Sequence, residues 1–298
     1  MQKCVIAVLG GDKRMDFAAR ELISLRYDVR EWGRREGDDA AAFSKIAREW
    51  LADVDVLMLP LPTSLDGIHL FTPNLGSEQK LRMDTLFSSA SQKLFLVGRL
   101  SEALRSRAER DNIRKIDYFE NEILQLKNAL PTAEGAIEIA MRELPVVLDG
   151  TKVAIIGFGR IGEVLAAKLK ALGAKVTVFA RRPDVCTRAE LLGYLAKRIT
   201  PTATGEYSLD FDTKTRVIFN TVPSRLLTKD VLKTLSRDCL IIDLASAPGG
   251  VDMSAAKELG IPAIWATALP GKCAPESAGV ILGQTVHSIL LEIRRFDF

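Results

Sequence analysis

Apolar segments that predict strands alternate with amphipathic segments that predict helices along the first 130 residues. Residues 4–9 (CVIAVL) form an apolar run, Gly10 and Gly11 predict a turn, and apolar residues from Met15 to Leu22 recur at the spacing of one buried helical face. Such alternation is typical of a parallel sheet covered by helices on both faces. Further strands are predicted at 27–32, 54–59, 94–97 and 116–119, and helices at 39–51 and 121–130.

The same alternation returns in the second half of the chain. An apolar strand at 153–156 leads into a glycine turn and a helix, and another strand follows at 176–180. The whole pattern predicts two Rossmann-like, doubly wound α/β domains with parallel sheets and an interdomain cleft. The later strands are predicted at 216–222, 240–244 and 263–265, and helices at 228–235, at 253–259 and around 189–197.

Pro131 marks the predicted boundary between the two domains. A proline disfavours continuation of the preceding helix, and Thr132 can cap the N-terminus of the next one. We therefore expect a hinge at 130–132, a substrate-binding domain at 1–130 and a dinucleotide-binding domain at 131–275. After Pro275 the periodicity predicts a terminal helix of about 20 residues, and we expect residues 276–298 to pack back on the first domain.

Composition narrows the class of protein. A chain of 298 residues, 47% of them hydrophobic, can bury two cores. Its 41 basic and 38 acidic residues give a net charge of only +3 without a basic stripe interleaved with aromatic residues, so nucleic acid is not an expected partner. No apolar run reaches the ~18 residues that span a bilayer, and the N-terminus lacks a signal-peptide pattern. We expect a cytoplasmic homo-oligomer that acts on a small molecule.

Cysteine and histidine are too few and too scattered to predict a metal site. The four cysteines show neither C-x-x-C nor Cys/His ligand spacing, which argues against a structural zinc and against a disulfide framework. Of the two histidines, His69 lies in a predicted loop, where it could be a base or a plain loop side chain, and His287 is expected on the surface of the terminal helix.

The turn after the strand at 153–156 carries the G-x-G-x-x-G spacing of a dinucleotide site. Gly157 permits the tight turn, Gly159 lets the backbone approach a pyrophosphate, and Gly162 lets the helix pack close to the strand. The helix N-terminus offers N–H groups and a partial positive charge to the phosphates. A glycine-rich turn without a ligand is the structural alternative, which the complete βαβ setting disfavours.

Two arginines stand where a ribose-binding carboxylate is usual. The strand at 176–180 leads into Arg181 and Arg182, and no Asp or Glu ends it. Guanidinium groups at this place favour a 2′-phosphate, so NADP is the predicted cofactor and NAD is an alternative. The alternative without a binding role is that both arginines are solvated loop residues. Residues that follow strands complete the predicted cofactor set: Gly157, Gly159, Arg160, Ile161, Gly162, Arg181, Arg182, Thr221, Val222, Pro223, Ala245 and Ser246.

With these features the chain resembles a known family, the dipicolinate synthase A-type subunits of spore-forming bacteria. The resemblance spans nearly the whole chain, and the blocks at 131–140 and 269–279 are more specific than the glycine turn. It implies an oxidoreductase of sporulation, at a branch of the lysine pathway, that forms pyridine-2,6-dicarboxylate from a dihydro or hydroxytetrahydro ring with a nicotinamide cofactor. It also implies a partner, the flavoprotein-like B-type subunit of dipicolinate synthase. The blocks that carry it are GGDKR, PTAEGAIEIA, GFGRIG, NTVPSRLL, IIDLASAPGGVD and LPGKCAPESAG.

The implied reaction needs a dianionic ring to be held in place more than it needs acid catalysis. Cationic groups at fixed positions do this best, so Arg14 and Lys272, both in predicted turns, are candidate carboxylate clamps, with solvated loop cations as the alternative. Thr132 and Ser277 are candidate hydrogen-bonding residues. Asp12 is either the proton acceptor or a turn residue that bonds its own backbone, and the turn role is slightly favoured.

Two other functions stay open from the sequence. A D-2-hydroxyacid dehydrogenase needs a catalytic histidine near the end of the cofactor domain, and residues 265–279 contain none. The other alternative is a non-catalytic NADP-binding subunit that regulates a partner enzyme.

Overall fold

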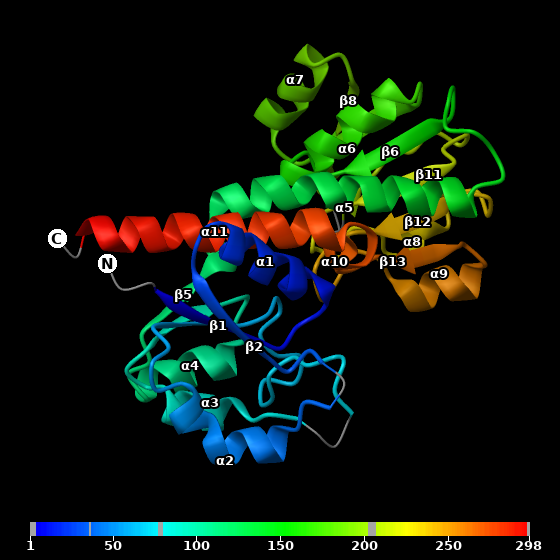
Figure 1. Ribbon diagram of the computed structural model, residues 1–298. Helices are drawn as coiled ribbons and strands as arrows, with labels where there is room; N and C mark the ends of the chain where they lie inside the picture. The colour runs from blue at the N-terminus through cyan, green and yellow to red at the C-terminus, as the bar shows by residue number, and fades with distance from the viewer. Residues whose placement is uncertain (1–3, 36, 77–79, 202–206, 297–298) are drawn as a thin grey trace. The chain divides into compact units, whose positions relative to one another are not determined.

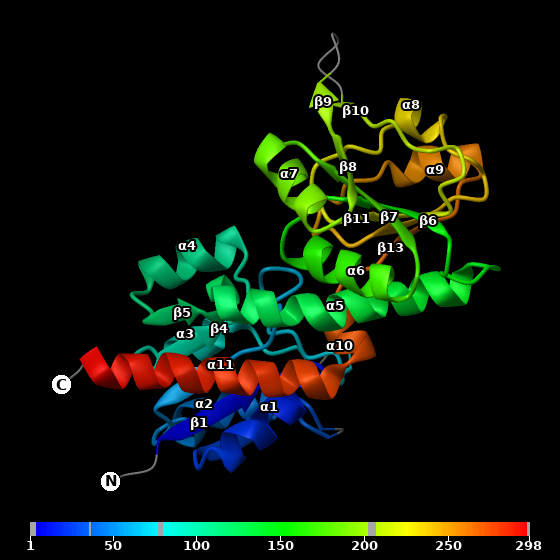
Figure 2. The same cartoon turned by 90° about the horizontal axis from the view of Figure 1, so that it is seen from above.

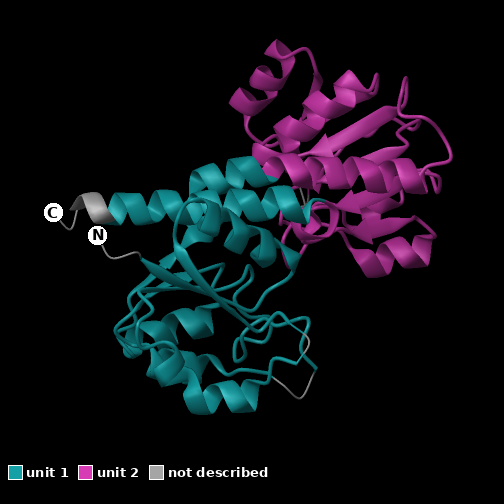
Figure 3. Ribbon diagram, viewed as in Figure 1, with its two compact units in different colours: residues 1–128, 274–298 teal, residues 129–273 magenta. Residues whose placement is uncertain are grey.

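The computed structural model describes residues 4–35, 37–76, 80–201 and 207–296, without the side chains of 294–296 (Figures 1 and 2). The chain divides into two compact units (Figure 3). Unit 1 comprises residues 1–128 and 274–298, and unit 2 comprises residues 129–273. The sequence placed the boundaries after residues 130 and 275. Each unit is built on one parallel sheet with helices, which confirms the predicted Rossmann-like α/β class.

Unit 1 holds a five-stranded sheet in the order β2-β1-β3-β4-β5, with every neighbouring pair parallel. Alternate side chains of a strand enter opposite cores. Ile6 packs with helices α1 and α11 on one face, whereas Ala7 packs with α2, α3 and α4 on the other. The elements are β1 (Val5–Leu9), α1 (Lys13–Ser24), β2 (Asp28–Trp32), α2 (Ala40–Trp50), β3 (Val56–Met58), α3 (Met83–Ser89), β4 (Leu94–Val97), α4 (Glu102–Arg110), β5 (Lys115–Asp117), a 3-10 turn (Tyr118–Glu120) and α11 (Pro275–Phe296).

Unit 2 holds a six-stranded parallel sheet in the order β13-β12-β11-β6-β7-β8, the strand order of dinucleotide-binding domains. Helices α5, α6 and α7 cover one face, and α8 and α9 cover the other (Figures 1 and 2). The elements are α5 (Glu122–Glu143), β6 (Lys152–Ile156), α6 (Arg160–Ala171), β7 (Lys175–Ala180), α7 (Pro183–Leu191), β8 (Leu195–Arg198), the antiparallel pair β9 (Thr200–Pro201) and β10 (Tyr207–Ser208), β11 (Val217–Asn220), α8 (Lys229–Leu232), β12 (Leu240–Asp243), α9 (Met253–Leu259), β13 (Ala263–Trp265) and α10 (Leu269–Cys273).

The predicted helix break at Pro131 and the predicted cap at Thr132 are wrong. Helix α5 carries the chain from unit 1 into unit 2 without a break, with Pro131 inside it, so Thr132 is an interior helical residue and caps nothing. A proline removes one helical hydrogen bond, but here the buried face continues on both sides of it. Ala129, Ala133 and Ala140 are all almost fully buried at helical spacing, and this burial outweighs the missing bond.

Two further assignments from the sequence are corrected. The helix expected around 189–197 is α7, which ends at Leu191, and the residues after it form the edge strand β8. Lys272 lies in the short helix α10 and not in a turn. Helices α3 and α4 were not predicted at all.

Helices α1 and α11 approach each other closely because glycine faces the contact. A Cβ atom at Gly279 would overlap the carbonyl oxygen of Arg14 and lie 2.5 Å from Cβ of Phe17, and one at Gly283 would lie 2.8 Å from Cβ of Glu21. The terminal helix therefore packs on the first helix of unit 1 at a distance that only glycine permits.

We expect Gly279→Ala to destabilise unit 1 by about 1–3 kcal/mol, because the added methyl group forces two packed helices apart. Gly76→Ala is the control, since a Cβ atom there has no neighbour within 4 Å. Chemical denaturation followed by circular dichroism measures both variants. Equal unfolding midpoints for the two would contradict the packing described.

Candidate functional site

The glycine turn of unit 2 leaves the N-terminus of α6 open to a ligand. Gly157 has a left-handed backbone (φ +93°), and a Cβ there would overlap Oγ1 of Thr221. A Cβ at Gly162 would overlap the carbonyl oxygen of Gly157. Gly159 differs, because a Cβ there would meet no atom within 4 Å, and as the N-cap of α6 it provides no side-chain hydrogen bond to the first turn. The N–H groups of a helix's first turn have no acceptor within the helix, and beside open space they suit a pyrophosphate.

Arginines gather where β7 and β8 end. Arg181 is exposed, and its side chain makes no ion pair with any residue that the structure describes. Arg182 is exposed and pairs with Asp184, which raises the pKa of Arg182 and lowers that of Asp184. Arg198 ends β8, and its Nε donates to the carbonyl oxygen of Arg181 at 3.3 Å. The sequence did not indicate Arg198, because its strand was interpreted as the end of a helix.

A buried Asn–Asp pair fastens the loops that follow β11 and β12. Asn220 and Asp243 are 0% and 1% exposed, and Nδ2 of Asn220 donates to Oδ1 of Asp243 at 2.8 Å. The Asp243 carboxylate also accepts hydrogen bonds from the backbone N–H groups of Ala245 (3.1 Å) and Gly250 (2.8 Å). Nδ2 of Asn220 also donates to the carbonyl oxygen of Val222 at 3.0 Å. One buried polar cluster thus sets both loops at the ligand-binding edge of the sheet.

The predicted cofactor residues after β11 and β12 lie in these loops. Thr221 donates from Oγ1 to the carbonyl oxygen of Ile156 at 2.9 Å, which ties the loop to the strand before the glycine turn. Ala245 is buried and its carbonyl oxygen accepts from Nε1 of Trp265 at 2.9 Å. Val222 and Ser246 are half-buried and Pro223 is exposed. The structure therefore collects the glycine turn and both loops at one edge of unit 2.

In unit 1, Asp12 and Arg14 bind each other. Asp12 is the N-cap of α1, and its carboxylate accepts from the backbone N–H, Nε and Nη2 of Arg14. Nη2 of Arg14 also donates to the carbonyl oxygen of Leu61 at 2.5 Å, and the residue is only 5% exposed. Arg14 is therefore a buried residue in the first turn of a helix and not a loop cation. Through these contacts Asp12 caps α1, where the sequence predicted a turn residue that bonds its own backbone.

The remaining catalytic candidates lie on helices. Lys272 is exposed in α10 and makes no ion pair with the described residues. Thr132 is half-buried in α5, and Ser277 is exposed in the first turn of α11. Within unit 2, α10 packs on α5 where a Cβ at Gly135 would lie 2.8 Å from Sγ of Cys273. The two most specific sequence blocks thus meet at Gly135 and Cys273.

Both histidines have partners inside unit 1. Nδ1 of His69 lies 2.7 Å from Oδ2 of Asp66 on an exposed loop, and hydrogen bonds from His69 lower the pKa of Asp66. Nδ1 of His287 lies 2.9 Å from the hydroxyl of Tyr27, so this half-buried ring contacts the connection between α1 and β2. Among the described residues there is no cluster of His, Cys, Asp and Glu that could hold a metal ion, and no helix long and apolar enough to cross a membrane.

Comparisons with known proteins agree with this architecture. Residues 5–119 match the N-terminal domain of dipicolinate synthase A-type subunits, and residues 113–203 match the NAD binding domain of D-isomer specific 2-hydroxyacid dehydrogenases. The dipicolinate synthase A-type subunit of Bacillus subtilis is 31% identical over 97% of this chain and 96% of its own.

Solved structures of dipicolinate synthase A-type subunits also resemble this chain. That of the dipicolinate synthase A-type subunit from Bacillus halodurans is 27% identical with a TM-score of 0.83 and covers 96% of this chain and 97% of its own. The structure of its counterpart from Bacillus subtilis is 28% identical with a TM-score of 0.81, covering 99% and 98%. D-lactate dehydrogenase from Escherichia coli, 12% identical with a TM-score of 0.60 over 97% of each chain, shares the fold.

We expect Asp243→Ala to destabilise unit 2 by about 3 kcal/mol or more, because Asn220 and two backbone N–H groups lose their buried acceptor. Asp238→Ala is the control. Its carboxylate is 72% exposed and pairs with Arg216 at 3.4 Å, so its loss should cost less than about 1 kcal/mol. The two variants are compared by thermal and urea unfolding. A stable Asp243→Ala protein would show that the cluster does not fasten the loops.

Proposed function

Because the chain belongs to the family of dipicolinate synthase A-type subunits, we propose that it forms pyridine-2,6-dicarboxylate by hydride transfer from a dihydro- or hydroxytetrahydro-dipicolinate to NADP. The observation that carries this proposal is the open N-terminus of α6 behind Gly159, within a dehydrogenase-type strand order. When bound, the oxidised nicotinamide accepts a hydride. The ring loses a proton as well, and the hydroxylated ring also loses water. The setting proposed for this reaction is sporulation, in the cytoplasm.

We propose that unit 2 binds the dinucleotide through its backbone and its arginines. The first turn of α6 holds the pyrophosphate, and the loops after β11 and β12 bound the rest of the molecule. Arg181 is the principal ligand of a 2′-phosphate, because its guanidinium has no acid to compete for it among the described residues. Arg182 must exchange Asp184 for the phosphate, and Arg198 adds a third positive charge.

For the substrate we propose different roles for the two predicted clamps. Lys272 is exposed and has no paired acid among the described residues, so it can bind a carboxylate directly. Arg14 is proposed to hold the Asp12 carboxylate and the Leu61 carbonyl in position rather than to bind the substrate, because both already engage its guanidinium. Unit 1 is proposed as the substrate-binding unit, with Ser277 of α11 as a further hydrogen-bonding residue. Thr132 of α5 belongs to unit 2 and is proposed as a hydrogen-bonding residue there.

We propose that a second, flavoprotein-like subunit is the partner of this chain, because the names of the related proteins make each of them one component of a synthase. Self-association is also proposed.

A 2-hydroxyacid dehydrogenase activity is disfavoured even though the NAD-binding match covers residues 113–203, because no histidine lies in 265–279 to protonate a keto oxygen. A regulatory, non-catalytic role is the outcome that remains if no hydride is transferred.

We expect wild-type protein to bind NADP more tightly than NAD at low salt, with a difference that shrinks as salt screens the charges. Arg181→Asp should weaken NADP binding by about 10- to 100-fold, because one charge-assisted contact is lost and a repulsive charge is added. The control is Arg237→Asp, which changes an exposed arginine just before β12, at the opposite edge of the sheet. Calorimetric titration measures all constants. Equal wild-type affinities for NAD and NADP would remove the basis for this preference.

Lys272→Ala should lower kcat/KM for pyridine-2,6-dicarboxylate formation by about 100-fold while leaving NADP affinity nearly unchanged, because substrate orientation is lost and the glycine turn is not. Lys257→Ala, which changes an exposed lysine of α9, is the control. The assay follows the aromatic product from freshly generated ring substrate, with NADP and the partner protein present. Full activity of Lys272→Ala would contradict its role, and no wild-type product would favour the regulatory alternative.

A further inference from the structure

An arginine in unit 1 has a backbone conformation that its place in the fold does not require. Among the described residues, four non-glycine residues are left-handed. Arg26 and Asn112 directly follow the C-caps of α1 and α4, where a left-handed residue is a common way to end a helix. Ala268 (φ +58°) directly precedes helix α10 in unit 2, whereas Arg99 (φ +54°) lies in the loop that follows strand β4. Left-handed backbone outside helix ends is concentrated at functional sites.

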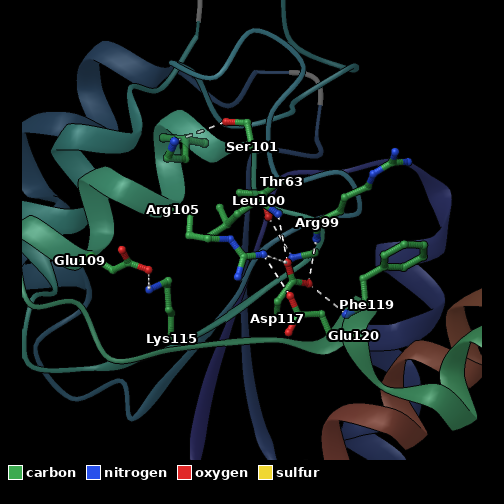
Figure 4. Close-up of polar contacts among 12 residues, drawn as sticks. Thr63, Arg99, Leu100, Ser101, Arg105, Glu109, Lys115, Asp117, Phe119 and Glu120 are labelled. Carbon is green, nitrogen blue, oxygen red and sulfur yellow. Dashed lines mark hydrogen bonds and ion pairs between the residues drawn. The ribbon is translucent and has the colours of Figure 1, made fainter. Parts of the chain in front are cut away.

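The conformation of Arg99 is fixed by a carboxylate from the neighbouring strand. Asp117, the last residue of β5, accepts hydrogen bonds from the backbone N–H groups of Arg99 (2.9 Å), Leu100 (3.1 Å) and Phe119 (3.0 Å) (Figure 4). The Asp117 side chain is only 8% exposed. Just before Arg99, the backbone N–H of Gly98 donates to Oγ1 of the buried Thr63 at 2.9 Å. The loop is therefore held on both sides of Arg99.

The side chain that this loop presents is charged and not neutralised. The Arg99 guanidinium lies 6.0 Å from the ring centre of Phe119, and Figure 4 shows it on the Phe119 side, away from the Asp117 carboxylate. It forms no ion pair with a described residue. Arg14 and Arg105, by contrast, are both paired with carboxylates in the same unit. A glycine would adopt this backbone with less strain. The presence of an arginine at position 99 is therefore explained by its side chain and not by the backbone.

We propose that Arg99 binds one carboxylate of the ring dicarboxylate, an assignment that rests on the function proposed above. Ligands of open parallel sheets bind beyond the carboxyl ends of the strands, and Arg99 is the second residue after β4 ends, following Gly98. A guanidinium presents two parallel N–H groups that match a carboxylate, and a rigid backbone reduces the entropy lost on binding. Arg99 thus takes the role that the sequence assigned to Arg14.

The test separates binding from stability. Pyridine-2,6-dicarboxylate is titrated calorimetrically into the full-length wild type, Arg99→Gly, Arg99→Lys and Arg26→Gly. Arg26→Gly is a matched control, because it replaces an exposed, left-handed arginine of the same unit. We expect Arg99→Gly to weaken ring binding about 10- to 100-fold, with an unchanged or raised melting temperature and unchanged NADP affinity. Arg99→Lys should restore part of the affinity, and Arg26→Gly should bind as the wild type does.

Three results would overturn the assignment. Wild-type affinity in Arg99→Gly would exclude Arg99 as a ligand, and product formation by the wild type would then leave the proposed function standing. A lowered melting temperature together with lost NADP affinity would show that Arg99 only supports the fold. A wild type that neither binds the ring nor forms it in the presence of the partner protein would overturn both proposals together.

Discussion

The start of α6 depends on the absence of side chains at two positions. The helix begins four residues after β6 ends, and Gly157 and Gly162 touch so closely that a Cβ on Gly162 would overlap the backbone of Gly157. A helix placed this way directs the N–H groups of its first turn toward the edge where the strands end. Gly159 then leaves that end uncovered, so the turn that allows the close packing also leaves open the helix end at which we propose the pyrophosphate binds.

In both units, buried carboxylates hold the loops at the edge of the sheet where the parallel strands end. Asp243 ends β12 and Asp117 ends β5, and each accepts backbone N–H groups from its own loop, while Asp117 also holds the loop after the adjacent strand β4. A buried carboxylate is costly unless several donors surround it, so each acid and its loop stabilise one another. In unit 2 the result is a pair of fixed loops beside the glycine turn. In unit 1 it is an arginine held in a left-handed conformation.

Local sequence patterns predicted the fold class, because buried parallel strands are apolar runs that can be recognised without knowing which distant residues they contact. β4 and β13 begin and end where the sequence placed them. The errors arose where tertiary packing decides. Burial of Ala133 and its neighbours keeps Pro131 inside α5, and the edge strand β8 has a weak signal, since Leu195 is 61% exposed. Arg99 could not be found from the sequence, because Asp117, which fixes its backbone, lies 18 residues away.

Transfer of a hydride from the ring to the nicotinamide is the central step of the proposed function. The direct measurement uses a ring substrate deuterated at the carbon that is oxidised, incubated with this protein, its partner protein and NADP, followed by mass spectrometry of the dinucleotide. We expect one deuterium in the reduced dinucleotide for each molecule of pyridine-2,6-dicarboxylate formed. Aromatic product without labelled NADPH would contradict this and show that the hydride leaves by another route.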